Sequence, residues 1–334
     1  MPTPPVLVTG GTGVVGSAVV RRLVDDGGRP VRALARSGEA DVALVTAGAV
    51  PVRGDVLDVA SLERSMDGCE VVYHVAGVNQ FCVRDPAPMW EANVRGSVNC
   101  VVAAARAGVR RLVYTSSAVT LGEVDGTVGH EDSPHRGTFL SNYERSKYDA
   151  EVAVWREAER VGLDVVSVNP SSVQGPGRAS GTGKVLVLYL QGKLPAWVDT
   201  TISLVDVDDC AQGHVLAEMK GEPGRRYVLN GSSLSSDDLM ATMAKVAPGV
   251  KPPRMVPAAV VSGVVAVAAG AARLRRQAPI ACRESMRALL HGHRYDGSRA
   301  ERELGLSYRP IEDTLRRTAE WLVAEGLAPA SALG

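Results

Sequence analysis

Aromatic side chains are scarce in this sequence, which has two Phe, four Trp and eight Tyr among its 334 residues. An excess of charge of either sign is also missing, because 37 Lys and Arg residues balance 37 Asp and Glu residues. Nucleic-acid-binding proteins usually carry a basic surface, and those that bind single strands add aromatic rings on which bases stack. The composition therefore argues against nucleic acid and favours a small molecule as the partner.

Clustered cysteines are missing as well. The five cysteines lie far apart, with no Cys-x-x-Cys pair and no histidine spaced to join them as metal ligands, so we expect no metal site. We interpret them as buried or incidental thiols in a reducing compartment. The residues before Val6 lack the basic and apolar regions of a secretory signal, which favours a cytoplasmic protein. The cysteines are Cys69, Cys82, Cys100, Cys210 and Cys282.

One long uncharged run, from residue 255 to residue 272, needs separate consideration. Its 18 residues are near the lower limit for a membrane span, but Pro257 interrupts it and Ala, Val and Gly predominate. We expect a buried or surface-packed helix. Peripheral membrane contact, helped by the basic residues that follow, is the weaker alternative, and a true span is the weakest. Those basic residues are Arg273, Arg275 and Arg276.

The first 25 residues predict a strand, a glycine turn and a helix. Residues 5–9 are apolar and rich in β-branched side chains, and they lead directly into Gly-x-x-Gly-x-x-Gly. Gly10 permits a tight turn, Gly13 permits close approach of a pyrophosphate, and Gly16 permits close packing of the helix on the strand. The pattern is one residue longer than the common dinucleotide-binding fingerprint. The expected cofactor-binding residues are Gly10, Thr12, Gly13, Val14, Val15 and Gly16.

Short apolar runs then alternate with helical stretches up to about residue 170. This alternation predicts an α/β fold with a doubly wound parallel sheet, a Rossmann fold, joined by right-handed crossovers. The expected strands are 5–9, 30–35, 49–53, 70–75, 111–115 and 164–168.

The pattern becomes mostly helical after residue 170, with one clear strand at 227–229. We therefore expect a Rossmann domain over residues 1–170, to which a segment around 203–232 returns. Residues 171–202 and 233–330 should form a smaller, mostly helical substrate lobe at the carboxyl ends of the strands, where such sheets bind ligands.

The end of the second expected strand bears on the choice of cofactor. Ala35 occupies the position where NAD-binding sheets usually place a carboxylate for the ribose 2′-hydroxyl, and Arg36 follows it. A guanidinium suits a 2′-phosphate, so we expect NADP(H) to be favoured over NAD(H), although Arg36 could also be a solvated loop residue. Other residues expected at the cofactor cleft are Asp55 and Val56 after the third strand, and Ala76 and Gly77 after the fourth.

Tyr143 and Lys147 are four residues apart in a helical stretch and so share one face. A phenol with a pKa near 10 is a poor base at neutral pH, and a nearby ammonium favours the phenolate. Residues 115–118, which follow the fifth strand, can present a hydroxyl to the same substrate oxygen.

Taken together, these motifs resemble the extended short-chain dehydrogenase/reductases, and the match covers nearly the whole chain. Within that family the sequence is most similar to the dihydroflavonol reductase-like and 3β-hydroxysteroid dehydrogenase-like branch. Segments 181–184, 195–200 and 205–214 are most similar to a group labelled hopanoid-associated sugar epimerases. The motifs that carry the family resemblance are residues 9–16, 54–55, 74–77, 93–96, 115–118, 143–147 and 169–170.

The resemblance implies roles for individual residues. Ser117, Tyr143 and Lys147 match the family's catalytic triad, with Lys147 also binding ribose hydroxyls. Asn93 matches an asparagine with a structural or proton-relay role. Asn169 and Pro170 stand where the family usually has Arg-Pro, and we expect both at the cofactor.

Three functions remain open. The leading one is an NADP(H)-dependent oxidoreductase that interconverts a secondary alcohol and a ketone or aldehyde on a small or medium apolar substrate. The alternative is a nucleotide-sugar epimerase or dehydratase with tightly bound NAD(P), although no clear set of diphosphate-binding arginines is present. The third, a dinucleotide-sensing regulator without catalysis, is disfavoured by retention of the triad. Either a monomer or a homodimer is compatible with the sequence.

Overall fold

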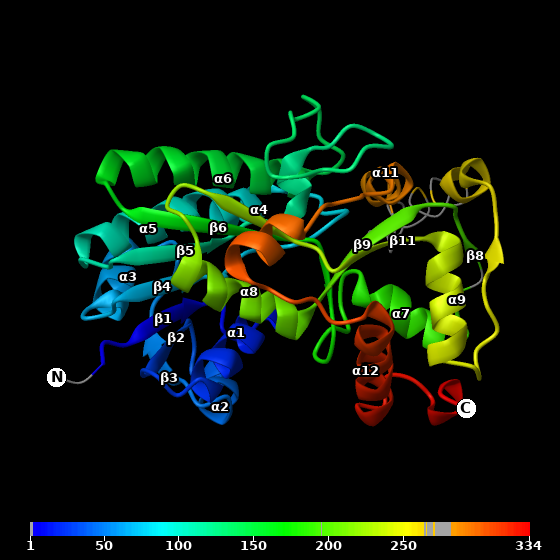
Figure 1. The fold of residues 1–334 in the computed structure, drawn as a ribbon, viewed down its shortest axis with the longest axis horizontal. Helices are drawn as coiled ribbons and strands as arrows, with labels where there is room; N and C mark the ends of the chain where they lie inside the picture. Colours follow the sequence, from blue (N-terminus) through cyan, green and yellow to red (C-terminus); the bar gives the residue numbers. More distant parts are fainter. Residues whose placement is uncertain (1–2, 195, 264, 266–269, 271–281) are drawn as a thin grey trace.

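A computed structural model describes residues 3–334 except residues 195, 264, 266–269 and 271–281 (Figure 1). Its main feature is a seven-stranded, wholly parallel sheet in the order β10-β6-β5-β4-β1-β2-β3. The predicted doubly wound α/β fold is therefore confirmed, and the six strands expected up to residue 170 all form. The strands are β1 (Val6–Thr9), β2 (Val31–Ala35), β3 (Val50–Arg53), β4 (Val71–His74), β5 (Arg111–Thr115), β6 (Asp164–Pro170) and β10 (Arg226–Leu229).

Helices cover both faces of this sheet (Figure 1). Successive side chains of a strand point to opposite faces, so Val6 and Val8 of β1 pack into one apolar core and Leu7 packs into the other. Each core is completed by its own helices. The first core is covered by α1 (Val14–Asp25), α2 (Glu39–Thr46) and α8 (Val207–Lys220), and the second by α3 (Val59–Met66), α5 (Gly96–Arg106) and α6 (Asn142–Val161).

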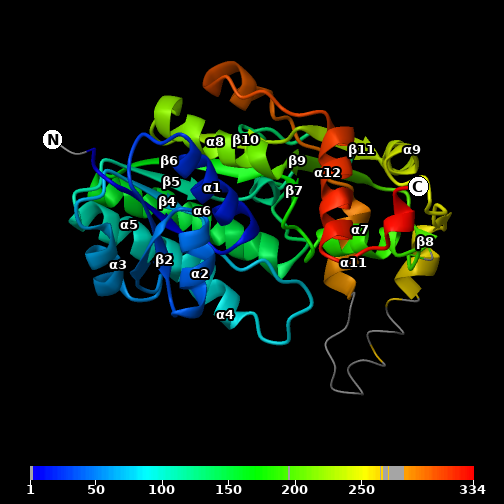
Figure 2. The same ribbon diagram turned by 90° about the horizontal axis from the view of Figure 1, so that it is seen from below.

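The substrate lobe lies beside the carboxyl ends of the large sheet and has an apolar core of its own (Figure 2). It contains a three-stranded sheet in the order β11-β9-β7 and a two-stranded pair, β8 with β12. Its strands are β7 (Ser172–Gln174), β8 (Ala196–Trp197), β9 (Thr201–Asp206), β11 (Ser232–Ser235) and β12 (Arg254–Met255). Its helices are α7 (Gly183–Leu190), α9 (Ser236–Val246), α11 (Arg283–His291) and α12 (Ile311–Ala324).

The expectation of a single clear strand beyond residue 170 is thus wrong. Of the missed strands, β7, β8 and β12 have only two or three residues, and β11 has the sequence Ser-Ser-Leu-Ser, which lacks the apolar alternation that identifies a strand. These strands form because β9 pairs with β11 on one side and β7 on the other, and such pairing is a tertiary interaction.

The interpretation of the cysteines also needs correction. Cys82, in the loop after β4, and Cys282, directly before α11, form a disulfide across a sequence separation of 200 residues. The other three cysteines are buried thiols, as expected: Cys69, Cys100 and Cys210. Sequence spacing did not reveal the pair because only the fold brings the two segments together.

In the part of the chain that the structure describes, no helix has the length and apolar character needed to cross a membrane. The uncharged run at 255–272 lies partly outside the described residues, so the expected packed helix stays a prediction.

Candidate active site

The glycine turn after β1 is packed so closely against backbone that side chains are excluded at Gly10 and Gly16. Gly10 has φ of +70°, and a Cβ there would lie 2.7 Å from the backbone nitrogen of Ala76. A Cβ on Gly16 would run into the carbonyl of Gly10. Thr12 and Gly13 are exposed, and no side chain caps the start of α1. The turn therefore presents unshielded N–H groups at a helix N-terminus, which suits a pyrophosphate.

Arg36 projects from the carboxyl end of β2. Ala35 is buried, whereas Arg36 is exposed and forms no ion pair with any residue that the structure describes. Sequence reasoning missed a second guanidinium nearby. Arg53, which pairs with Ala35 in the sheet register, donates to the carbonyl of Ser37 at 3.3 Å and also binds Asp41.

The other predicted cofactor residues lie at the ends of neighbouring strands. The Asp55 carboxylate accepts from the backbone N–H of Leu57 at 2.9 Å, and the carbonyl of Val56 accepts from Asn99. Ala76 donates its backbone N–H to Thr9 at 3.2 Å. A Cβ on Gly77 would lie 4.0 Å from the Lys147 Nζ, so this glycine lies beside the predicted triad.

Tyr143 and Lys147 lie in the first turns of α6. The helix begins there because the Ser141 hydroxyl accepts from the N–H of Glu144 at 3.0 Å. Lys147 is buried and donates to the carbonyl of Thr115 at 2.8 Å. Burial lowers the pKa of Lys147 to about 8, against the opposing effect of Glu151. The ammonium therefore still carries its charge at neutral pH.

Ser117 follows β5 and stands next to the Tyr143 phenol. Burial raises the pKa of Tyr143, whereas the Ser117 hydroxyl and the guanidinium of Arg178 both oppose this rise. The structure thus brings together the three residues of the predicted triad. It also adds Arg178, to which the sequence analysis assigned no role.

Two asparagines position the triad. Asn93 bonds both backbone groups of Val78, at 2.7 and 2.9 Å, and donates to Ser146 on α6 at 3.0 Å. Asn169 is fully buried, and its amide donates to the Ser117 carbonyl and to the Glu151 carboxylate. Its side-chain donors are thus used inside the protein, and the expected contact of Asn169 with the cofactor stays a prediction. Pro170 is buried at the end of β6.

His74 is held in a similar way. It bonds the hydroxyls of Thr9 at 2.8 Å and Ser97 at 3.0 Å. Burial and the nearby Lys147 lower its pKa to about 3. His74 is therefore neutral at physiological pH and links β1, β4 and α5.

The substrate side of the site is closed by elements from both halves of the chain. The Phe81 ring lies 5.9 Å from the Tyr143 ring, centroid to centroid. Its neighbour Cys82 is bonded to Cys282, and Glu284 of α11 accepts from the backbone N–H groups of Cys82 and Asn142. The start of α11 thus holds both the Phe81 loop and the start of α6.

At the other end of α11 lies a buried charge cluster. His293 bonds the Glu123 carboxylate at 2.6 Å, and His291 approaches it at 3.3 Å. Burial would raise the pKa of Glu123, but these two histidines lower it to about 2. Among the described residues, these three side chains could hold a metal ion, since their ligand atoms lie within 4.8 Å of one another. The expectation of no metal stays a prediction.

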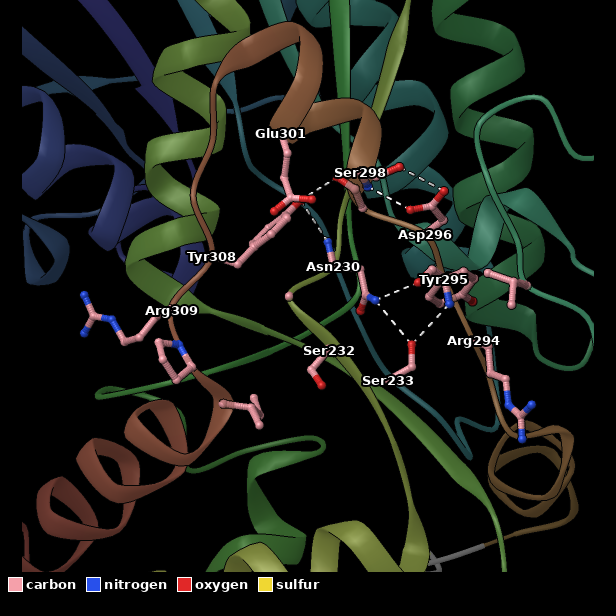
Figure 3. A pocket seen from close by; sticks show the side chains of 15 residues that line it. Asn230, Ser232, Ser233, Arg294, Tyr295, Asp296, Ser298, Glu301, Tyr308 and Arg309 are labelled. Carbon is pink, nitrogen blue, oxygen red and sulfur yellow. Dashed lines mark hydrogen bonds between the residues drawn. The ribbon is translucent and has the colours of Figure 1, made fainter.

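A cavity of about 650 Å³ lies elsewhere, between β11 and the segment that follows α11 (Figure 3). The side chain of Asn230 spans it, donating to the carbonyl of Tyr295 at 2.7 Å. None of the triad residues lines this cavity, and its wall includes several charged and hydroxyl side chains.

Comparisons with known proteins agree with this arrangement. Residues 6–229 match the NAD dependent epimerase/dehydratase family. The chain is 31% identical to a putative dihydroflavonol 4-reductase of Synechocystis sp., over 96% of this chain and 94% of the relative. It is 32% identical to sterol demethylase protein B of Methylococcus capsulatus, over 96% and 99%. The crystal structure of gox2253 superposes with a TM-score of 0.82 at 32% identity, covering 98% of this chain and 100% of that one.

Proposed function

Because the chain belongs to the NAD dependent epimerase/dehydratase family, we propose that it is an NADP(H)-dependent oxidoreductase acting through Ser117, Tyr143 and Lys147. The resemblance to the extended short-chain dehydrogenase/reductases is confirmed, and the chain is an NAD(P)-dependent enzyme of that group. In this proposal it interconverts a secondary alcohol and a ketone or aldehyde on a small or medium apolar molecule. The observations that carry the proposal are the Ser117 hydroxyl beside the Tyr143 phenol and Lys147 between the Thr115 carbonyl and Gly77, with relatives named as reductases in support.

Each residue has a separate task in this reaction. The bound cofactor supplies or accepts hydride at the reacting carbon. Ser117 donates a hydrogen bond to the substrate oxygen, and Tyr143 gives that oxygen its proton during reduction. Lys147 holds ribose hydroxyls with the protons that Thr115 does not use, since an ammonium has three.

The glycine turn and Arg36 hold the other end of the cofactor. Exposed backbone N–H groups at the start of α1 would bind the pyrophosphate. Arg36 would bind the 2′-phosphate, because its guanidinium is exposed and forms no ion pair with the described residues. NADP(H) should therefore bind more tightly than NAD(H).

A nucleotide-sugar epimerase or dehydratase is the second candidate, and the family match favours it. A UDP-glucose 4-epimerase of Streptomyces lividans is 32% identical over 72% of this chain and 80% of the relative. Such an enzyme would use the same triad but keep its cofactor bound through each turnover. The two candidates differ in whether cofactor is consumed.

The test measures NADPH and NADH consumption with a panel of ketones, steroids, flavonoids and nucleotide sugars. We expect stoichiometric NADPH consumption with at least one apolar ketone. Conversion of a nucleotide sugar without net consumption of cofactor would support the second candidate instead.

A further inference from the structure

Arg178 is a half-buried cation without a counter-charge. It lies in the turn between β7 and α7. Its Nη2 donates to the Thr182 hydroxyl at 3.4 Å, and its Nε is buried without a hydrogen-bond partner. No carboxylate among the described residues lies within 4 Å of it. Several other half-buried guanidiniums pair with a carboxylate, namely those of Arg136, Arg226, Arg299 and Arg317, whereas Arg32, which donates to the Asp67 carbonyl, and Arg309 pair with none that the structure describes.

The surroundings of Arg178 hold it in place without neutralising it. A Cβ on Gly181 would lie 2.9 Å from its Nη2, and one on Gly183 would lie 2.9 Å from its Cγ. The Thr182 hydroxyl that it contacts also bonds Gln174 at 3.1 Å. The neighbours on this side are thus uncharged, and burial lowers the pKa of Arg178 with only Tyr143 opposing.

Arg178 also lies at the same edge of the large sheet as the predicted triad, because its turn follows β6 and β7, and Asn169 near the end of β6 donates to the Ser117 carbonyl at 3.3 Å. The charges of Arg178 and Tyr143 accordingly affect the pKa of each other. A buried charge is unfavourable unless an opposite charge is close to it. A guanidinium that is partly buried near the predicted catalytic phenol and has no carboxylate partner would be stabilised by a negatively charged ligand.

We propose that the substrate carries a carboxylate near its reacting carbon and that Arg178 binds it. This inference rests on the proposed function, and it adds one negative charge to the otherwise apolar substrate. A guanidinium matches a carboxylate through two parallel hydrogen bonds. A single guanidinium matches one charge, whereas a diphosphate carries at least two.

The test compares medium-chain 2-, 3- and 4-oxo acids with their methyl esters, which differ only in the charge. Wild-type protein should reduce at least one acid with a kcat/KM about tenfold to a hundredfold above that of its ester. Arg178→Ala should remove this preference by lowering kcat/KM for the acid about tenfold to a hundredfold more than kcat/KM for its ester, since any effect on the Tyr143 phenol is common to both substrates. Arg178→Lys should keep part of the preference, because it keeps the charge but not the two parallel bonds.

Arg294→Ala is the matched control, since Arg294 is exposed, lines the separate cavity and donates to Thr201 at 3.2 Å. It should keep the preference for acids. Equal kcat/KM values for acid and ester in wild-type protein would overturn the inference and leave the reductase proposal intact.

Calorimetric titration of the NADP⁺ complex with the same acids and esters separates the two proposals when no ketone is reduced. Tighter binding of the acid that is lost in Arg178→Ala would support the carboxylate site even though the reductase proposal had failed. Equal binding of acid and ester would overturn it. Tighter binding of a phosphate monoester than of the matched acid would also overturn it, because the site would then select phosphate.

Discussion

The large parallel sheet and the small β11-β9-β7 sheet are held together by different forces. Every residue of β1 and β4 is buried, and apolar helices cover both faces. In the small sheet, β11 is partly exposed, and a hydrogen bond between Ser203 and Ser233 at 2.7 Å joins it to β9 in addition to the apolar contacts of the lobe's core. Burial of many apolar side chains gives a large total stabilisation and tolerates substitution by other apolar side chains of similar size. A single polar contact contributes little stabilisation but requires a particular partner.

In the proposed function, the residues that bind the cofactor and those that bind the substrate are positioned by different kinds of contact. The glycine turn, Arg36 and Lys147 are positioned by the heavily buried sheet and its helices. Arg178, Phe81 and α11 are positioned by loops, single hydrogen bonds and one disulfide. Changes on the substrate side can therefore alter which molecule binds while the cofactor site stays intact.

The prediction with the largest expected effect is that the proton transfer by Tyr143 can be removed without loss of cofactor binding. Tyr143→Phe keeps the ring that packs against Phe81 but removes the proton donor. Turnover should fall by about 10²-fold to 10⁴-fold with little change in NADP(H) affinity. Steady-state kinetics and a fluorescence titration with NADPH measure the two quantities.

Lys147→Ala is the matched variant, because it should weaken NADP(H) binding as well as turnover. A Tyr143→Phe enzyme that retained a large fraction of its activity would require another proton donor. His74 would then be a poor replacement because it is buried and neutral, which leaves the exposed His130.

The second prediction concerns stability in the two sheets. Leu7→Ala deletes a fully buried side chain from the large sheet and should lower the free energy of unfolding by about 2–5 kcal/mol. Ser203→Ala removes a hydroxyl that bonds Ser233 and His293, so its cost should be about 1 kcal/mol. Urea unfolding measures both, and equal losses would contradict the contrast between the sheets.

The third prediction concerns cofactor choice. Arg36→Ala should reduce the preference for NADP(H) over NADH by about tenfold to a hundredfold, since a charge-assisted bond contributes about 1.5–3 kcal/mol. Arg53→Ala provides the comparison, because Arg53 already binds Asp41 and should matter less. Equal affinities for NADPH and NADH in the unchanged protein would refute the assignment.

The last prediction concerns pH. Burial lowers the pKa of His74 to about 3 and of His214 to about 4, so both stay neutral in the folded protein. In the unfolded chain these two histidines bind protons below about pH 6.5. The free energy of unfolding should therefore fall as the pH is lowered from 6.5 toward 4, by about 1.4 kcal/mol per pH unit for each histidine.

In the substrate lobe's cluster, the Glu123 pKa of about 2 is below the unfolded value of about 4.3. The stabilisation that the Glu123 carboxylate gives the folded state is therefore fully present above pH 4.3 and is lost as the pH falls toward 2. Urea unfolding at pH 7.5 and 5.5 should show the histidine effect. A stability independent of pH over this range would contradict the prediction.

The sequence was informative wherever local pattern and residue type were sufficient. The strand before Gly10 is an apolar run followed by a glycine turn, and the helix that carries Tyr143 and Lys147 has a serine cap. These features are readable over a few residues, so the large sheet and the positions of the triad followed from them.

The rest depends on contacts between distant segments. The Cys82–Cys282 bond joins residues 200 positions apart, and the Glu123 cluster forms only when the end of α11 reaches the loop after β5. Arg178 looked like an ordinary residue of a loop rich in glycine and serine. Its missing counter-charge became visible only with the neighbouring side chains in place.

The disulfide also gives the chain a topology. It closes residues 82–282 into a covalent ring with two linear tails. Ser117, Tyr143 and Lys147 lie inside the ring, whereas the Gly10 turn lies on the amino-terminal tail. The large sheet is thus assembled from three strands of the ring and four of that tail. A protease that cuts once within the ring would release no fragment until a reductant is added, whereas a cut in either tail would release one on unfolding.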